Sequence, residues 1–163
     1  WNGAHPDTGA TGIYMRTSAW TWDIDDAVDP WIEAGAWGWQ DLGVALASAD
    51  DLDEDLPACS TLPFCNPARC RLDVVSTVTD FPGYGWGWTM EGKWGPQSDI
   101  SWVMITSGLE PHDRRSVMAH ELGHVLGLDH LPAESESLMS AENRGFTEAQ
   151  GADIDAALAL CAE

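Results

Sequence analysis

The chain has 163 residues, of which 44% are hydrophobic and ten are tryptophans, so it fits one globular domain over residues 1–163 and does not resemble a disordered acidic chain. Its 27 acidic residues outnumber seven basic ones and give a formal net charge of -20, which excludes a nucleic-acid partner because phosphate binding needs a basic patch. The sequence has no apolar run of transmembrane length, so we expect no membrane span. We also expect the protein to be a monomer.

The N-terminal part of the chain predicts two strands and a helix. Residues 1–17 predict an extended arm, whereas residues 20–24 alternate between apolar and polar side chains as a half-buried strand does. Asp29 followed by Pro30 predicts the start of a helix, and residues 44–47 predict a second short strand. One stripe of that helix is apolar and is expected in the core: Val28, Trp31, Ile32, Gly35, Trp39 and Leu42.

The middle of the chain predicts loops followed by three strands. The acidic run at residues 50–55 predicts a solvated loop, with a calcium site as the alternative because clustered carboxylates suit Ca2+. A proline-punctuated loop at residues 59–70 is irregular. Strands are expected around residues 72–78, at a sheet edge near residues 86–91, and at residues 101–105.

The four cysteines are Cys59, Cys65, Cys70 and Cys161, and they form no C-x-x-C pair and lie apart from the histidines in the sequence. This spacing favours two disulfide bonds over a metal cluster, and disulfides indicate secretion. A chain that begins at Trp1 without an apolar leader fits a mature secreted form. Among three possible pairings we expect Cys70–Cys161 with Cys59–Cys65, because Cys161 lies on the expected buried face of the last helix.

The stretch from His120 to His130 reads H-E-L-G-H-V-L-G-L-D-H and carries the chemistry. Positions four apart share a helical face, so His120 and His124 can point two imidazoles at one ion. Gly127 permits a left-handed turn that ends the helix, after which His130 supplies a third nitrogen. Three protein ligands leave one coordination position open, which indicates one catalytic zinc ion rather than a structural one.

Glu121 follows the first of these histidines and cannot bind the same ion in this geometry. Its carboxylate is expected to face the open coordination position. A carboxylate there can take a proton from water and hand it to the leaving amine. Glu121 is therefore the candidate general base.

Two helices are expected in the C-terminal part. Glu110-Pro111 opens the helix that carries the histidines, and its core-facing residues are Met118, Leu122 and Val125. Residues 147–150 form a capping-box pattern that opens a last helix, and the residues expected on its buried face are Ile154, Leu158 and Cys161.

The pattern H-E-x-x-H-x-x-G-x-x-H, with Ser137-Leu138-Met139-Ser140 downstream, resembles the metzincin peptidases, and residues 130–139 most resemble the matrixin branch. The resemblance implies an α+β fold of the α/β-sandwich type, with a twisted mixed sheet, a motif helix, a methionine turn at Met139 and a closing C-terminal helix. In that fold Met139 forms an apolar floor beneath the metal. The strand near residues 86–91 forms the rim above it, where an unpaired edge can bind an extended peptide.

The same resemblance implies a secreted zinc-dependent endopeptidase that acts on protein or peptide substrates. The zinc ligands would be His120, His124 and His130, and Glu121 would be the catalytic base.

Two features depart from the matrixins. Only His5 and His112 remain outside the motif, so the structural zinc site of that family cannot be assembled. The loop at residues 140–146 is also shorter, and within it Arg144 is the charged group that could select an acidic side chain.

Two alternatives remain open. One is another metzincin branch, astacin-like or snapalysin-like, although snapalysins carry an aspartate where this chain has His130. The other is a binding or inhibitory module that keeps zinc without turnover. Such a module would have no need of Glu121, so the sequence favours the enzyme.

Overall fold

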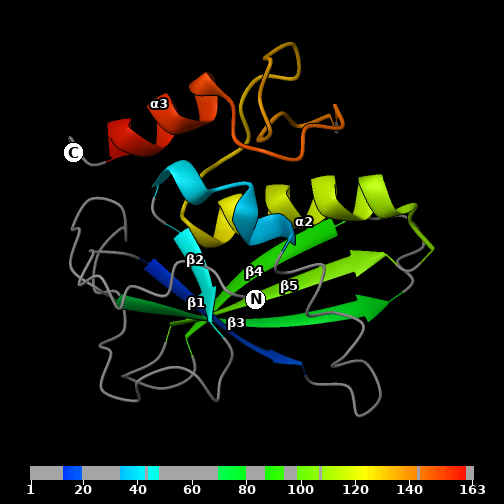
Figure 1. Ribbon diagram of the computed structural model, residues 1–163, viewed down its shortest axis with the longest axis vertical. Helices are drawn as coiled ribbons and strands as arrows, with labels where there is room; N and C mark the ends of the chain where they lie inside the picture. The colour runs from blue at the N-terminus through cyan, green and yellow to red at the C-terminus, as the bar shows by residue number, and fades with distance from the viewer. Residues whose placement is uncertain are drawn as a thin grey trace.

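The computed structural model describes residues 13–19, 34–42, 44–47, 70–79, 87–93, 99–106, 108–142 and 144–160. In these residues the fold mixes helix and strand, as expected for the α+β class. A single five-stranded sheet forms one layer, and the helices lie on one side of it (Figure 1).

The sheet is mixed, and its strands follow the order β2-β1-β3-β5-β4. Strand β1 pairs in parallel with β2 and β3, β3 pairs in parallel with β5, and β4 is antiparallel to β5. Within the described residues, β4 therefore forms one edge of the sheet and β2 the other. The strands are β1 Ile13–Ala19, β2 Val44–Ala47, β3 Cys70–Thr79, β4 Gly87–Lys93 and β5 Asp99–Thr106.

Four of the five strands lie where the sequence predicts them, but β1 corrects the prediction of an extended arm. Strand β1 is flanked by β2 and β3, so it lies inside the sheet rather than at its edge. Interior parallel strands are commonly covered on both faces and need no alternation of apolar and polar residues. The predicted strand at residues 20–24 lies outside the described residues.

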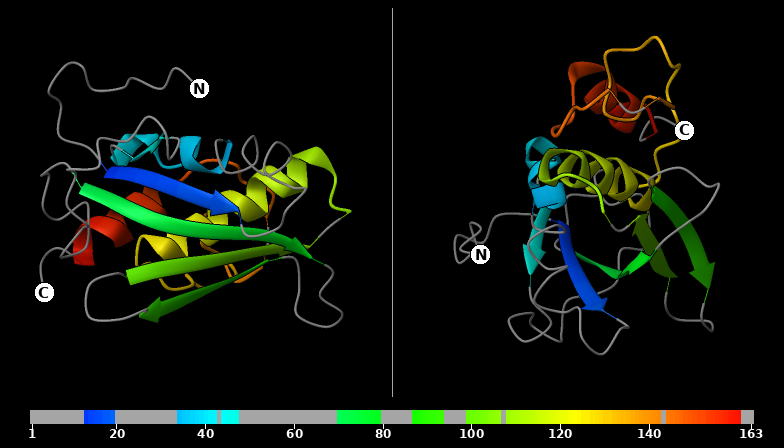
Figure 2. Two further views of the ribbon diagram at one scale, coloured as in Figure 1. Left: turned by 90° about the horizontal axis from the view of Figure 1, so that it is seen from below. Right: turned by 90° about the vertical axis from the view of Figure 1, so that its right-hand side faces the viewer.

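Helix α2, Pro111–Val125, lies across one face of the sheet against β4 and β5 (Figure 2). Helix α3, Gly151–Leu160, lies on the side of α2 that faces away from the sheet. A helical turn at residues 34–37 continues into the 3-10 helix η1, Gln40–Leu42. Among the helices of the described ranges, none combines the length and apolar character that a bilayer crossing requires.

The core surrounds α2, because residues on several sides of this helix are buried. On the sheet side, Val103 and Ile105 of β5 are fully buried. Trp39 packs beside the helix, and its indole N–H donates a 2.7 Å hydrogen bond to the carbonyl of Ala119. The predicted core positions Met118, Leu122 and Val125 are all buried, as is Trp39.

Helix α3 differs from its prediction in both its start and its buried face. It begins at Gly151, after the expected capping box, and the carboxylate of Asp153 accepts a hydrogen bond from the Gln150 N–H at 2.7 Å. Asp153 and Ala157 are its buried residues, whereas Leu158 is 52% exposed. The apolar pattern failed here because the buried face is anchored by a carboxylate rather than by an aliphatic side chain.

Three of the four cysteines of the expected disulfides, Cys59, Cys65 and Cys161, lie outside the described residues. Cys70 is the first residue of β3. The acidic run at residues 50–55 also lies outside the described residues, as does His5.

Candidate active site

The candidate site forms where α2 ends. The helix begins with Pro111 after an extended Glu110, and proline suits this position because the first turn leaves its N–H groups unpaired. His120 and His124 lie one turn apart near its C-terminal end. Their side chains therefore project from the same face of the helix, as the sequence predicts.

The helix ends in a Schellman turn at Gly127. This glycine has a φ of 95°, a left-handed conformation that costs a residue with a Cβ considerably more. The Gly127 N–H bonds to the His124 carbonyl at 2.9 Å, and the Leu128 N–H bonds to the Gly123 carbonyl at 3.1 Å. The chain thus turns back toward the helix, and His130 lies beside the two helical histidines.

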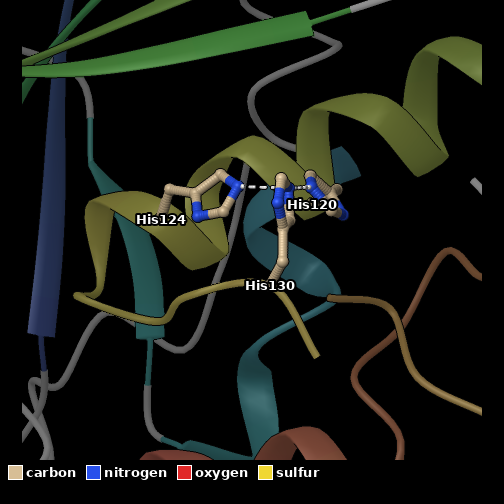
Figure 3. Close-up of side chains that lie close together, drawn as sticks. All are labelled: His120, His124 and His130. Carbon is tan, nitrogen blue, oxygen red and sulfur yellow. Dashed lines mark hydrogen bonds between the residues drawn. The ribbon is translucent and has the colours of Figure 1, made fainter. Parts of the chain in front are cut away.

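The three imidazoles converge through their Nε2 atoms (Figure 3). The Nε2 atom of His130 lies 3.1 Å from Nε2 of His120 and 3.1 Å from Nε2 of His124. One N–H cannot satisfy both neighbouring nitrogens at once. A zinc ion with Zn–N distances of about 2.0–2.1 Å fits between nitrogens spaced in this way, so the donor set suits zinc.

Backbone carbonyls orient two of the rings. Nδ1 of His120 donates to the Leu138 carbonyl at 2.7 Å, and Nδ1 of His124 donates to the Leu128 carbonyl at 2.7 Å. A carbonyl can only accept, so both Nδ1 atoms carry a proton, and in a neutral imidazole Nε2 then offers its lone pair. This tautomer is the one that a metal ligand needs.

Burial keeps His120 in the neutral form. Desolvation lowers the pKa of His120 to about 4, although its hydrogen bond to the Leu138 carbonyl acts in the opposite direction. The ring is therefore unprotonated at Nε2 in neutral solution and needs no deprotonation before it binds a metal.

Glu121 is buried, with an exposed fraction of 5%, and its carboxylate points toward β4. Desolvation raises the pKa of Glu121 from 4.5 to about 7, and a hydrogen bond from Thr89 partly opposes this rise. A carboxyl with such a pKa can exchange a proton near neutral pH.

A cavity of about 480 Å³ joins the Glu121 carboxylate to His124 and His130. It is bounded on one side by β4 and on the other by the turn that follows α2. Its lining residues are Gly87, Thr89, Glu121, His124, Gly127, Leu128, Asp129 and His130. A base, two of the metal-binding histidines and the edge strand therefore share one space.

Met139 lies beneath the histidine-bearing end of α2. It is fully buried, and its sulfur occupies the space that a Cβ at position 123 would need, so Gly123 permits the contact. The adjacent Leu138 supplies the carbonyl that orients His120. Residues 138 and 139 thus connect the core to a candidate ligand.

Asp153 of α3 holds this segment in place. Its buried carboxylate accepts hydrogen bonds from the N–H groups of Leu138 at 2.8 Å and Met139 at 3.0 Å. It also accepts one from the hydroxyl of Ser137. Four donors, including the Gln150 N–H, surround this fully buried carboxylate and satisfy its oxygens.

Arg144 does not present a free guanidinium to a substrate pocket. Its Nε donates to the Ala133 carbonyl at 2.8 Å, and its second nitrogen donates to the same oxygen. These hydrogen bonds link the side chain of Arg144 to the backbone of Ala133. Selection of acidic substrate side chains by Arg144 would require this contact to break.

The four residues that the sequence places at the site, His120, Glu121, His124 and His130, lie together in the fold. Two further residues were missed. Thr89 carries no distinguishing signal, because a threonine in a strand is ordinary. Asp153 does carry one, since an aspartate within the first turn of a helix is a favourable partner for unpaired N–H groups.

Comparisons with known proteins add an independent finding. The family model described as Peptidase_M10, Matrixin, matches residues 76–157, just over half of the chain. The matched segment runs from within β3 through β4, β5 and α2 to residue 157 of α3. A comparison with curated proteins finds no match.

Asp153→Asn is expected to weaken zinc binding by about 10- to 100-fold and to lower the free energy of unfolding by about 3 kcal/mol. The amide places an NH2 donor against backbone N–H donors, so residues 137–139 lose their anchor and His120 loses its orientation. Zinc titration against a chelator and urea denaturation measure the two effects. Asp155→Asn, an exposed change on the same helix, is the control, and equal behaviour of the two variants would contradict this role.

The metal-free protein should show the cost of burying Glu121. Its folded-state pKa of about 7 exceeds 4.5, so the stabilisation from protonation is complete below pH 4.5 and is lost as the pH rises through about 7. Glu121→Gln should therefore raise the free energy of unfolding above about pH 8 by up to about 3 kcal/mol, and the difference should vanish in acid.

Urea denaturation of metal-free protein across this pH range measures the difference. Glu134→Gln is the control because Glu134 is exposed. A Glu121→Gln curve parallel to that of the parent at every pH would show that the buried carboxylate carries no such cost.

Proposed function

Because this chain belongs to the matrixin family, we propose that it is a zinc-dependent endopeptidase that hydrolyses peptide bonds in protein or peptide substrates. The observation that carries this proposal is the convergence of three histidine nitrogens, two of whose rings line the same cavity as the buried Glu121. A bare metal-binding site would not require Glu121, whose burial is unfavourable when the carboxylate is charged.

His120, His124 and His130 would hold the zinc through Nε2. When bound there, zinc supplies a Lewis acid that polarises the scissile carbonyl and lowers the pKa of water. Glu121 would take the proton from the attacking water and return it to the leaving amine. A pKa near neutrality suits both transfers, because the group must accept and then release a proton in one cycle.

Strand β4 would form the rim along which the substrate lies. It ends the sheet in the described part of the chain, and its residues Gly87 and Thr89 line the cavity. An unpaired edge strand can add an extended peptide through backbone hydrogen bonds, which gives affinity without reading sequence. This geometry suits an endopeptidase that accepts unfolded protein segments.

The remaining expectations belong to the same proposal. Met139, buried against Gly123, would serve as the methionine turn beneath the metal. We further propose one catalytic domain over residues 1–163, a monomer, secretion, and the two disulfides Cys70–Cys161 and Cys59–Cys65. For residues 50–55 we propose a solvated loop, with a calcium site as the alternative. Peptide mapping for thiols and metal analysis of the purified protein test these points.

The zinc-loaded protein is expected to digest casein or an unbiased peptide library, and a chelator should abolish the activity. Glu121→Gln should retain zinc and lower kcat by about 100- to 10,000-fold, because the base is lost while the ligands remain. His124→Ala should lose the metal itself, since two ligands hold zinc poorly. Metal analysis and peptide cleavage rates separate the two outcomes.

His112→Ala is the matched control, because His112 is an exposed histidine on the same helix outside the group of three. It should keep zinc and activity. Full zinc occupancy in the parental protein without cleavage of any unfolded protein would reject the endopeptidase assignment. Zinc loss in Glu121→Gln equal to that in His124→Ala would reject the role of Glu121 as base.

Binding along β4 makes a separate prediction for the substrate. Only every second peptide N–H faces a neighbouring antiparallel strand, so methylation of single backbone nitrogens should weaken binding at alternate positions. We expect KM to rise by about five- to tenfold at those positions and little at the others. Steady-state kinetics on a series of singly methylated peptides measure this, and a uniform response along the peptide would contradict strand addition.

A further inference from the structure

Residues on one face of strand β4 contact Glu121, and the same strand bounds the cavity. We propose that Thr89 and Gly87 form a clamp that positions the Glu121 carboxylate, which makes Thr89 a positioning residue for the reaction. This inference rests on the proposed function, since it assigns a role in the same reaction. Neither residue is a metal ligand or a proton carrier in this proposal.

Thr89 supplies the attractive half of the clamp. Its hydroxyl donates a short hydrogen bond of 2.5 Å to Oε2 of Glu121. The same hydroxyl lies 3.1 Å from the backbone carbonyl oxygen of Glu121. A hydroxyl that meets both the backbone and the carboxylate of one residue restricts the path of the side chain between them.

Gly87 leaves room for the Glu121 carboxylate because it has no Cβ. A Cβ built on Gly87 would lie 2.5 Å from Oε1 and 2.8 Å from Cγ of Glu121, and 2.7 Å from Val117. These distances are too short for real contacts, so an alanine would displace the carboxylate or the strand. Because residues two apart in a strand share a face, Gly87 and Thr89 meet Glu121 from the same side.

The clamp treats the two carboxylate oxygens differently. Thr89 occupies Oε2, whereas Gly87 leaves Oε1 without a side chain in front of it. Both residues and Glu121 line the cavity. In this proposal Oε2 is held by the strand and Oε1 accepts the proton from water.

The clamp itself is held by the core. Gly87 pairs with Ile105 and Thr89 pairs with Val103, and both partners on β5 are fully buried. Glutamate has three rotatable side-chain bonds, and an unrestrained carboxylate would sample positions that are useless for catalysis. A base must lie within about 0.5 Å of its productive position, so anchoring it to a buried strand favours the reaction.

The test uses Thr89→Val, which removes the hydroxyl and keeps the shape of the side chain. In the zinc-loaded protein we expect kcat to fall about 10- to 100-fold, with KM and zinc content within about twofold of the parent. Thr89→Ser restores the hydroxyl and should recover kcat to within about threefold. Gly87→Ala should lower kcat in the same way, and Thr147→Val, the same change remote from the site, should leave it unchanged.

Crystal structures of the parent and of Thr89→Val add a readout that does not depend on turnover. The proposal expects the Glu121 carboxylate to move away from β4 in the variant. An unmoved carboxylate, or parental kcat in Thr89→Val, would overturn the clamp. A change confined to KM would also overturn it, because Thr89 would then act on substrate. A parent that holds zinc but cleaves nothing would instead reject the proposed function, while the two structures would still decide the clamp.

Discussion

The hydrogen bonds that Asp153 accepts from residues 137–139 connect α3 to the histidine-bearing end of α2. Through them the position of Leu138 is defined, and the Leu138 carbonyl in turn orients the ring of His120. The chain of contacts runs from a buried carboxylate to a candidate metal ligand without crossing solvent. The order of the candidate metal ligands at the surface therefore depends on a carboxyl group buried behind them.

The three histidines could be predicted from the sequence because their arrangement is local. Helical periodicity places His120 and His124 on one face, and a glycine at position 127 permits the left-handed turn that returns His130. The strands at residues 44–47, 72–78 and 101–105 can also be predicted from the sequence, because their residue types favour strands. The arrangement of the histidines follows from residues close together in the chain, and the strands are predicted by the residue types within each of them.

The features that could not be predicted are those created by packing between distant segments. Thr89 reaches Glu121 across 32 positions of sequence, and no pattern in β4 distinguishes it from a threonine that faces solvent. The buried face of α3 was assigned to Ile154 and Leu158 because apolar residues usually point inward. Asp153 faces inward instead, because its carboxylate accepts hydrogen bonds from the backbone N–H groups of Leu138 and Met139. Strand β1 lies between β2 and β3 inside the sheet, so it needs no alternation of apolar and polar residues that would predict it.

The metal-binding group and the environment of the base differ in how much of the fold they require. All three histidines lie within eleven consecutive residues of the sequence, so they can meet as soon as one helix and one turn have formed. The surroundings of Glu121 require β4 to have paired with β5 and the sheet to have packed against α2. A folding intermediate with an ordered α2 and an unformed sheet would thus possess a metal-binding segment but no positioned base. The hydrolytic activity proposed for this chain would therefore require the paired and packed sheet as well as the segment that carries the histidines.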